Sequence, residues 1–142
     1  MERSVDVSNG QPIEPLIRVE TPPLQAIVVI RGGPITVAKI VEHARRQQAV
    51  FTYRGEPMVA VSVDLTIEGW SVERILRERM WSRSKYATTT VGELRSAGYE
   101  FVATSVAPHY SVVLPAASAG AAANFLAHFG PTFDNEFRDR RR

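Results

Sequence analysis

The chain's first candidate for chemistry is a histidine and a serine two residues apart, in the segment HYS at 109–111. Pro108 precedes them and has no backbone N–H to donate, which favours the start of a strand at His109. Side chains alternate along a strand, so His109 and Ser111 share one face and Tyr110 points to the other. Imidazole titrates near neutral pH, so we predict His109 as a general acid or base, with Ser111 or Tyr99 assisting. The alternative is that His109 is structural.

A second candidate is a basic segment that contains a tryptophan, at residues 71–86. On a helical wheel Arg74, Arg77 and Trp81 fall opposite the apolar side. Arginine and tryptophan suit phosphate contact and base stacking, and they are equally typical of protein interfaces. The alternative is that Trp81 folds back and covers the edge of the core. The predicted residues for binding RNA or a protein partner are Arg74, Arg77, Trp81, Arg83 and Lys85.

The composition excludes several classes of site. The 142 residues contain no cysteine, so there is no disulfide, no cysteine-bound zinc and no thiol nucleophile. The net charge is only +2, so basic charge is a local feature. The three histidines, His43, His109 and His128, have no metal-ligand spacing, and we expect neither metal nor cofactor. No signal peptide or long apolar run appears, which predicts a cytoplasmic protein without membrane contact.

The hydrophobic pattern predicts strands and capped helices. Apolar or alternating runs at 26–30, 58–63 and 109–115 indicate strands, and 85–90 is also β-like. We expect one hairpin from 50–54 with 58–63, and a second from 99–105 with 109–115. Thr36, Ser71 and Thr90 are predicted helix caps, a further helix is expected at about 119–129, and His43 is placed on a solvent-facing side.

The order of these elements indicates an α+β protein, with a largely antiparallel sheet covered by helices. The openings ITVAKI (35–40) and TTVGEL (89–94) are alike, which would fit two helix-plus-hairpin (αββ) modules. We expect residues 25–131 to form a single domain. The polar, proline-rich segment 1–24 is predicted as an extended or disordered arm, and 132–142 as a charged tail.

The segment VGELRSAGYEFVATSVAPHYSVVLP (residues 91–115) resembles the core of HicA-type mRNA-interferase toxins. The resemblance extends over about 90–130 and implies an α-β-β-β-α fold like that of double-stranded-RNA-binding domains. It also implies a catalytic histidine at His109. Ala107 and Pro108 stand where the family usually has a Gly-Ser pair. The matching positions are Leu94, Gly98, Tyr99, Val102, His109 and Pro115.

Two other resemblances imply other functions. Arg31 in IRGG and Ser62 in VSV are similar to the arginine and serine of mono-ADP-ribosyltransferases of the Arg-Ser-Glu type, although no Glu-x-Glu follows. The segment FTYRGEPMVAVSVD (51–64) is similar to the strand-turn-strand of Phd/YefM-type antitoxins. These imply a transferase-like toxin and an antitoxin-like binding protein.

Our sequence-based expectation is a small protein that engages RNA, as a toxin-like, metal-independent ribonuclease with His109 as acid or base. The alternatives are a non-enzymatic protein-binding module and an ADP-ribosyltransferase-like toxin. The candidate partners are RNA and a protein, either a cognate antitoxin or a second copy of the chain. An enzyme should depend on His109, whereas a binding module should depend on Trp81.

Overall fold

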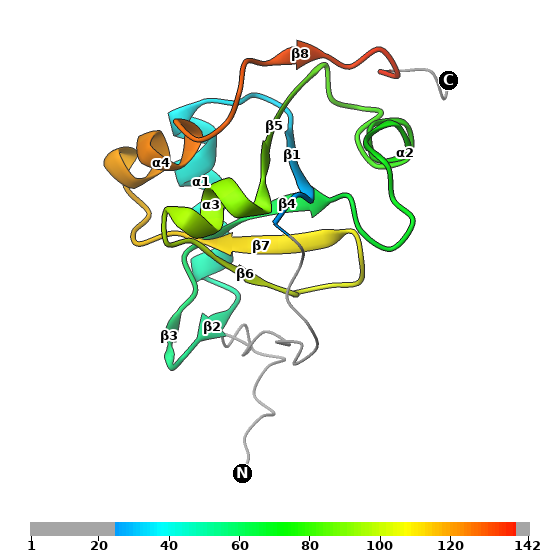
Figure 1. Cartoon of the computed structure of the whole chain (residues 1–142). Coiled ribbons are helices and arrows are strands. Elements are labelled where there is room, and N and C mark those ends of the chain that lie inside the picture. The colour runs from blue at the N-terminus through cyan, green and yellow to red at the C-terminus, as the bar shows by residue number, and fades with distance from the viewer. Residues whose placement is uncertain (1–24, 139–142) are drawn as a thin grey trace.

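A six-stranded antiparallel sheet organises the computed structural model, which describes residues 25–138 (Figure 1). The strand order is β6-β7-β4-β1-β5-β8. Its strands are β1 (Val28–Gly32), β4 (Ala60–Leu65), β5 (Lys85–Thr90), β6 (Glu100–Val102), β7 (His109–Val113) and β8 (Phe133–Asp134). The helices are α1 (Val37–Gln48), α2 (Val72–Glu78), α3 (Val91–Ser96) and α4 (Ala119–Leu126). The predicted α+β class is confirmed.

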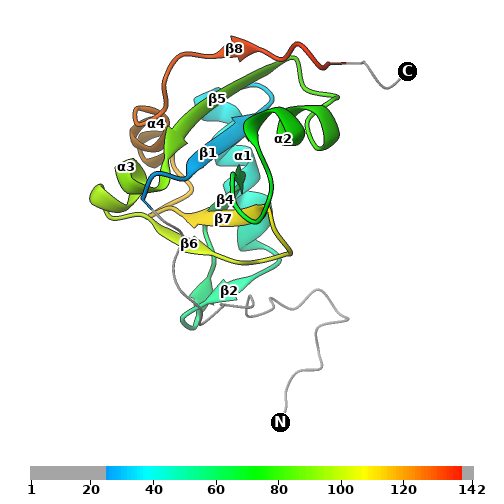
Figure 2. The ribbon, with the colours of Figure 1, turned by 45° about the vertical axis from the view of Figure 1, so that its right-hand side comes forward.

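Adjacent side chains of β1 pack against different helices. On β1, Val29 and Ile30 are both fully buried but belong to different apolar clusters. The cluster around Val29 includes residues of α1, α3 and α4, whereas Ile30 packs against Ile75 and Leu76 of α2. Figure 1 shows α2 well apart from α3 and α4, and Figure 2 shows β1 between β5 and β4.

The predicted helix starts are confirmed by their capping hydrogen bonds. The side chains of Thr36, Ser71 and Thr90 each accept a hydrogen bond from the backbone N–H three residues later. This side-chain acceptor satisfies an amide that has no partner within the helix. The short helix α3 ends before Gly98, whose positive φ of 94° favours glycine.

The first predicted hairpin is wrong in extent. Residues 52–53 (β2, Thr52–Tyr53) pair with 56–57 (β3, Glu56–Pro57), and 60–65 joins the main sheet as β4. Arg54 and Gly55 both have positive φ, which closes a two-residue turn and fixes the short register. The small hairpin is tied to β6 by Tyr53, whose hydroxyl donates to Glu100 at 3.0 Å.

The second predicted hairpin is confirmed as β6 and β7. Together with α3 and α4 it gives the order α-β-β-α over residues 91–126. The other neighbour of β7 is β4, which comes from earlier in the chain. The two αββ modules therefore differ, because the hairpin that follows α1 lies outside the main sheet.

The main sheet continues into the segment 132–142, which we predict as a charged tail. Phe133 on β8 pairs with Tyr86 of β5. Asn135 is buried, and its side-chain amide donates to the carbonyl oxygens of Met80 (2.8 Å) and Arg83 (3.2 Å). One polar side chain thus satisfies carbonyls just after α2, which a charged composition does not reveal. The predicted arm at 1–24 and residues 139–142 lie outside the described residues.

None of the helices in the described range 25–138 has the length and apolar character needed to cross a membrane.

Candidate functional site

The sheet opens between β1 and β4, and polar side chains gather at this opening. These strands pair only at Val29–Leu65 and Ile30–Asp64. Beyond Ile30, β1 continues alongside β5, while Ser62 of β4 pairs with β7. The Nη1 atom of Arg31 crosses the gap and donates to the Ser62 carbonyl oxygen at 2.8 Å. A side chain thus replaces a missing backbone partner of β4.

A cavity of about 180 Å³ lies at the opening and is lined by five parts of the chain. They are the end of β1, the middle of α1, β4, the start of β7, and the segment from the end of α2 to Arg83. Segments that lie far apart in the sequence therefore meet at one place. The polar residues that line the cavity are Arg31, His43, Ser62, Asp64, Arg79, Arg83 and His109.

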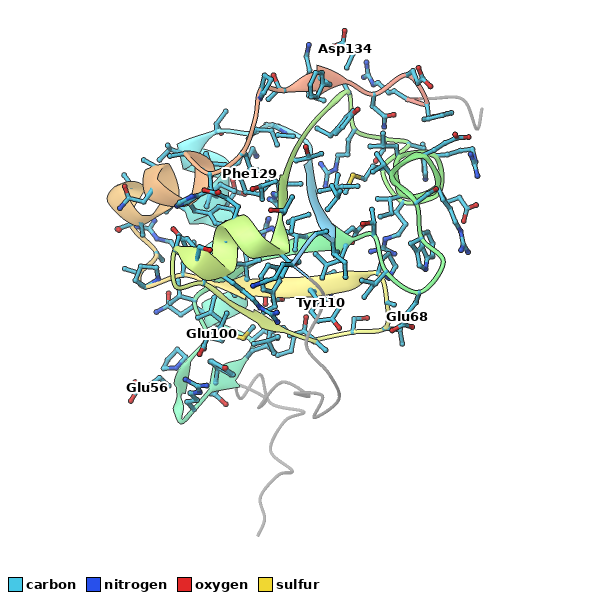
Figure 3. All side chains as sticks on the ribbon, viewed as in Figure 1. Glu56, Glu68, Glu100, Tyr110, Phe129 and Asp134 are labelled. Carbon is cyan, nitrogen blue, oxygen red and sulfur yellow. The ribbon has the colours of Figure 1, made fainter. Side chains whose placement is uncertain are left out.

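His109 lies at the start of β7, as predicted, and lines this cavity. Its strand partner is Asp64, and that of Ser111 is Ser62, so His109 and Ser111 do share a face. Ser111 is fully buried, and its hydroxyl lies 2.9 Å from Thr104 Oγ1, which is 3.4 Å from His109 Nδ1. Ser111 therefore stands behind the histidine. Tyr110 points to the other face and packs in the core (Figure 3).

His43 is the second histidine of the cavity, and it is half-buried there rather than fully solvent-facing as predicted. Its Nε2 lies 3.1 Å from Ser62 Oγ. One helical turn later, the Nε2 of Gln47 donates to the same hydroxyl at 3.3 Å. The polar side of α1 here faces the opening in the sheet. A helical wheel separates polar from apolar sides only, so it cannot distinguish a polar cavity from water.

The hydrogen bonds around Ser62 fit a neutral His43. Because Gln47 donates to the hydroxyl oxygen, the hydroxyl proton of Ser62 is free to point at His43 Nε2. Burial, together with the nearby charges of Arg31 and Arg46, lowers the pKa of His43 to about 4. At neutral pH the ring is therefore an uncharged base.

The pKa of His109 is also lowered, chiefly by burial, but Asp64 acts in the opposite direction. The Asp64 carboxylate is almost fully buried and is held by Arg79 through two hydrogen bonds, of 2.7 and 3.1 Å. Such a two-pronged contact fixes both side chains. Asp64 thus places a fixed negative charge beside His109. This charge favours the protonated form of the ring more than an uncharged neighbour would.

Arg31 makes the site strongly cationic. Burial, together with repulsion by Arg83 and Arg46, lowers its pKa to about 10. Its Nε atom is buried and has no hydrogen-bond partner. Positive charge therefore exceeds negative charge around the cavity, and this favours an anionic ligand.

Of the predicted binding residues, only Arg83 lines the cavity. Its stem lies against Gly33, and a Cβ on Gly32 would stand 2.7 Å from Met80 Sδ, so the two glycines allow a close approach. No carboxylate pairs with Arg83 among residues 25–138.

The other predicted binding residues are placed elsewhere. Arg74 pairs with Glu78 and lies over the Trp70 ring, 3.8 Å from its centre. Arg77 pairs with Glu73 at 2.8 Å, and Lys85 pairs with Asp134 of β8. Trp81 follows the end of α2 at Glu78, so it does not continue the face that carries Arg74 and Arg77.

The sequence pattern missed His43, Asp64, Arg79 and Arg46 as members of the site. Arg31 and Ser62 were singled out only through the resemblance to ADP-ribosyltransferases. The available signal was an arginine directly before two glycines at the end of a strand, which is typical of a close approach by another chain segment.

No cluster of three or more His, Cys, Asp or Glu side chains suited to a metal ion occurs within residues 25–138. Comparisons with protein-family models, with curated proteins and with solved structures found no match to this chain.

Proposed function

We propose that this protein is a metal-independent ribonuclease that cleaves RNA in the cavity between β1 and β4. The observation that carries the proposal is that two histidines, His43 and His109, line one cavity together with Arg31 and Arg83. Neither guanidinium group pairs with a carboxylate among residues 25–138. RNA cleavage without metal needs a base, an acid and positive charge at the phosphate, and this cavity has a candidate for each.

The reaction uses the ribose of the substrate as the nucleophile. His43, neutral above pH 4, removes the proton of the 2′-hydroxyl, whose oxygen attacks the adjacent phosphorus. His109 in its protonated form donates a proton to the departing 5′-oxygen. The products are a 2′,3′-cyclic phosphate and a 5′-hydroxyl end. Arg31 and Arg83 stabilise the charge that develops on the phosphate oxygens.

The assignment of base and acid follows from the surroundings of each ring. Three arginines are among the groups that lower the pKa of His43. His43 therefore binds a proton less tightly than His109 and acts as the base. Asp64 partly offsets the lowering of the His109 pKa, so His109 is the better candidate for the acid. In the folded protein the Ser62 hydroxyl occupies the hydrogen-bonding position at His43 Nε2, so the 2′-hydroxyl of the substrate takes its place when His43 acts as the base.

A cleavage assay with three matched histidine variants tests this proposal. His43→Gln and His109→Gln should each lower the cleavage rate of an end-labelled RNA by about 10²–10⁴-fold. His128→Gln is the control, because His128 pairs with Glu93 at 2.8 Å and does not line the cavity. The assay contains EDTA, and circular dichroism verifies that each variant is folded.

Two further readouts make the assay specific. DNA of the same sequence should remain intact because it lacks the 2′-hydroxyl, and the RNA products should carry 2′,3′-cyclic phosphate by mass spectrometry. Cleavage that persists unchanged in both cavity variants, or that ceases equally in His128→Gln, would contradict the assignment.

An ADP-ribosyltransferase is the second candidate, favoured by the contact of Arg31 with the Ser62 backbone. The carboxylate in the cavity is Asp64, which Arg79 holds. Release of nicotinamide from NAD by the wild-type protein, without RNA cleavage, would favour this candidate over the ribonuclease.

A further inference from the structure

A second cavity, of about 290 Å³, adjoins the proposed catalytic cavity. Arg31, Gly32, His43 and Arg83 line both, so the two spaces form one continuous cleft. The second cavity extends outward along α1. Four residues line the outer cavity but not the inner one. They are Pro34, Lys39, Glu42 and Arg46.

Positive charge dominates the outer cavity. Four cationic side chains line it, against the single carboxylate of Glu42. That carboxylate is shared between Lys39 (3.3 Å) and Arg46 (3.4 Å), and all three side chains are largely exposed. Exposed pairs of this kind contribute little to stability and separate easily. Lys39 and Arg46 are therefore available to a stronger anionic partner.

Arg31 and Arg83, which line both cavities, can still bind an anion. Arg31 Nε is buried without an acceptor, and Arg83 has no carboxylate partner in the described part of the chain. A buried donor without a partner raises the free energy of the folded protein unless a ligand or water satisfies it. Guanidinium groups bind phosphate through parallel N–H···O bonds, so a phosphate would meet this demand well.

We propose that the outer cavity holds a second phosphate of the RNA strand, next to the phosphate that is cleaved in the inner cavity. This inference rests on the proposed ribonuclease function and names the substrate that the cleft accepts, an oligonucleotide with at least two phosphates. Arg31 and Arg83 contact both phosphates, and Lys39 and Arg46 contact only the outer one. Glu42 opposes the binding, because it competes for Lys39 and Arg46.

Calorimetric titration with uncleavable deoxyribonucleotides tests the second phosphate separately from catalysis. The probes are a deoxydinucleotide with one internal phosphate (NpN), the same with a 5′-phosphate (pNpN), and the same with a 3′-phosphate (NpNp). The wild-type protein should bind pNpN or NpNp about tenfold more tightly than NpN at low salt, because the added phosphate gains charge-assisted hydrogen bonds.

Three variants of α1 locate the effect. Arg46→Gln should weaken the binding of pNpN or NpNp more than that of NpN, so that the gain from the terminal phosphate is lost. Glu42→Gln should increase the gain, since Lys39 and Arg46 lose their competing carboxylate. Arg45→Gln is the matched control, because Arg45 precedes Arg46 on the same exposed surface but does not line the outer cavity.

The outcomes separate the two proposals. If pNpN and NpNp bind no more tightly than NpN, the proposal of a second phosphate site is overturned. The ribonuclease proposal then still stands on NpN binding and on the histidine variants. If inorganic phosphate binds and Arg46→Gln weakens it, but no dinucleotide binds, the outer cavity takes free phosphate and the assignment to RNA is overturned. A gain that Arg45→Gln removes as fully as Arg46→Gln would also overturn it.

Discussion

At the scale of single residues, His43 links the site to the stability of the fold. Its pKa is about 4 in the folded protein and about 6.5 in an unfolded chain. Between these values the unfolded chain binds more protons, so the free energy of unfolding decreases as pH falls from about 6.5 to 4. Above pH 6.5 the ring is neutral in both states and has no such effect.

The wild-type protein should therefore lose more stability than His43→Gln when the pH is lowered from 7 to 4.5. We expect the difference to be on the order of 2 kcal/mol, because one pKa unit corresponds to ~1.4 kcal/mol and the partly exposed ring is screened by water. Urea unfolding at the two pH values measures it, with His128→Gln as the control. Equal losses in the wild type and His43→Gln would contradict the assigned environment of this ring.

At the scale of elements, the site depends on how closely the end of β1 approaches the segment after α2. A Cβ added at Gly32 would lie 2.7 Å from Met80 Sδ and 3.4 Å from Arg83 Cγ. Gly32→Ala should lower the free energy of unfolding by about 1 kcal/mol, at the low end of the cost of overpacking because the flexible Met80 side chain can yield, and weaken NpN binding because the segment that carries Met80 and Arg83 shifts away from β1. Urea unfolding and calorimetry measure the two effects.

Gly120→Ala provides the comparison for this substitution. Gly120 lies in α4 and an added Cβ there would meet no atom within 4 Å, so its stability should be unchanged or slightly higher. A Gly32→Ala variant that is as stable as Gly120→Ala and binds NpN like the wild type would show that the close approach is unimportant.

The elements also explain which features the sequence predicts. The starts of α1, α2 and α3 depend on a cap three residues away, and the β6–β7 hairpin depends on a nearby proline, so local patterns suffice. The short β2–β3 hairpin was misjudged because its register is set by the backbone angles of Arg54 and Gly55. The alternation of apolar side chains over 58–63 indicates a strand, but it does not reveal which strands lie beside it in the sheet.

At the scale of the whole molecule, the site forms where segments distant in sequence meet. His109 and Arg83 were predicted as functional because each belongs to a recognisable local pattern. His43 was misjudged, because only the sheet order shows that α1 lies over the opening between β1 and β4. The partnership of Asp64 with Arg79 links residues 15 positions apart and has no signal in local spacing.

The net charge of +2 likewise conceals the character of the cleft. Arg74 and Arg77 of α2 pair with carboxylates of the same helix, whereas Arg31 and Arg83 pair with no carboxylate among residues 25–138. The local balance of charge at the opening, rather than the total, therefore determines whether an anion binds.

The pH dependence of RNA cleavage, measured as kcat/KM, tests the central claim most directly, because this quantity reports the pKa values of the free enzyme. The account predicts a bell-shaped profile. It rises through about pH 4 as His43 loses its proton, and falls at higher pH as His109, whose pKa burial holds below the ordinary value of histidine, loses its own. The residual activity of His43→Gln should lack the rise, and that of His109→Gln should lack the fall. A rate that keeps increasing above pH 7 in the wild-type protein, or that keeps both limbs in these variants, would contradict it.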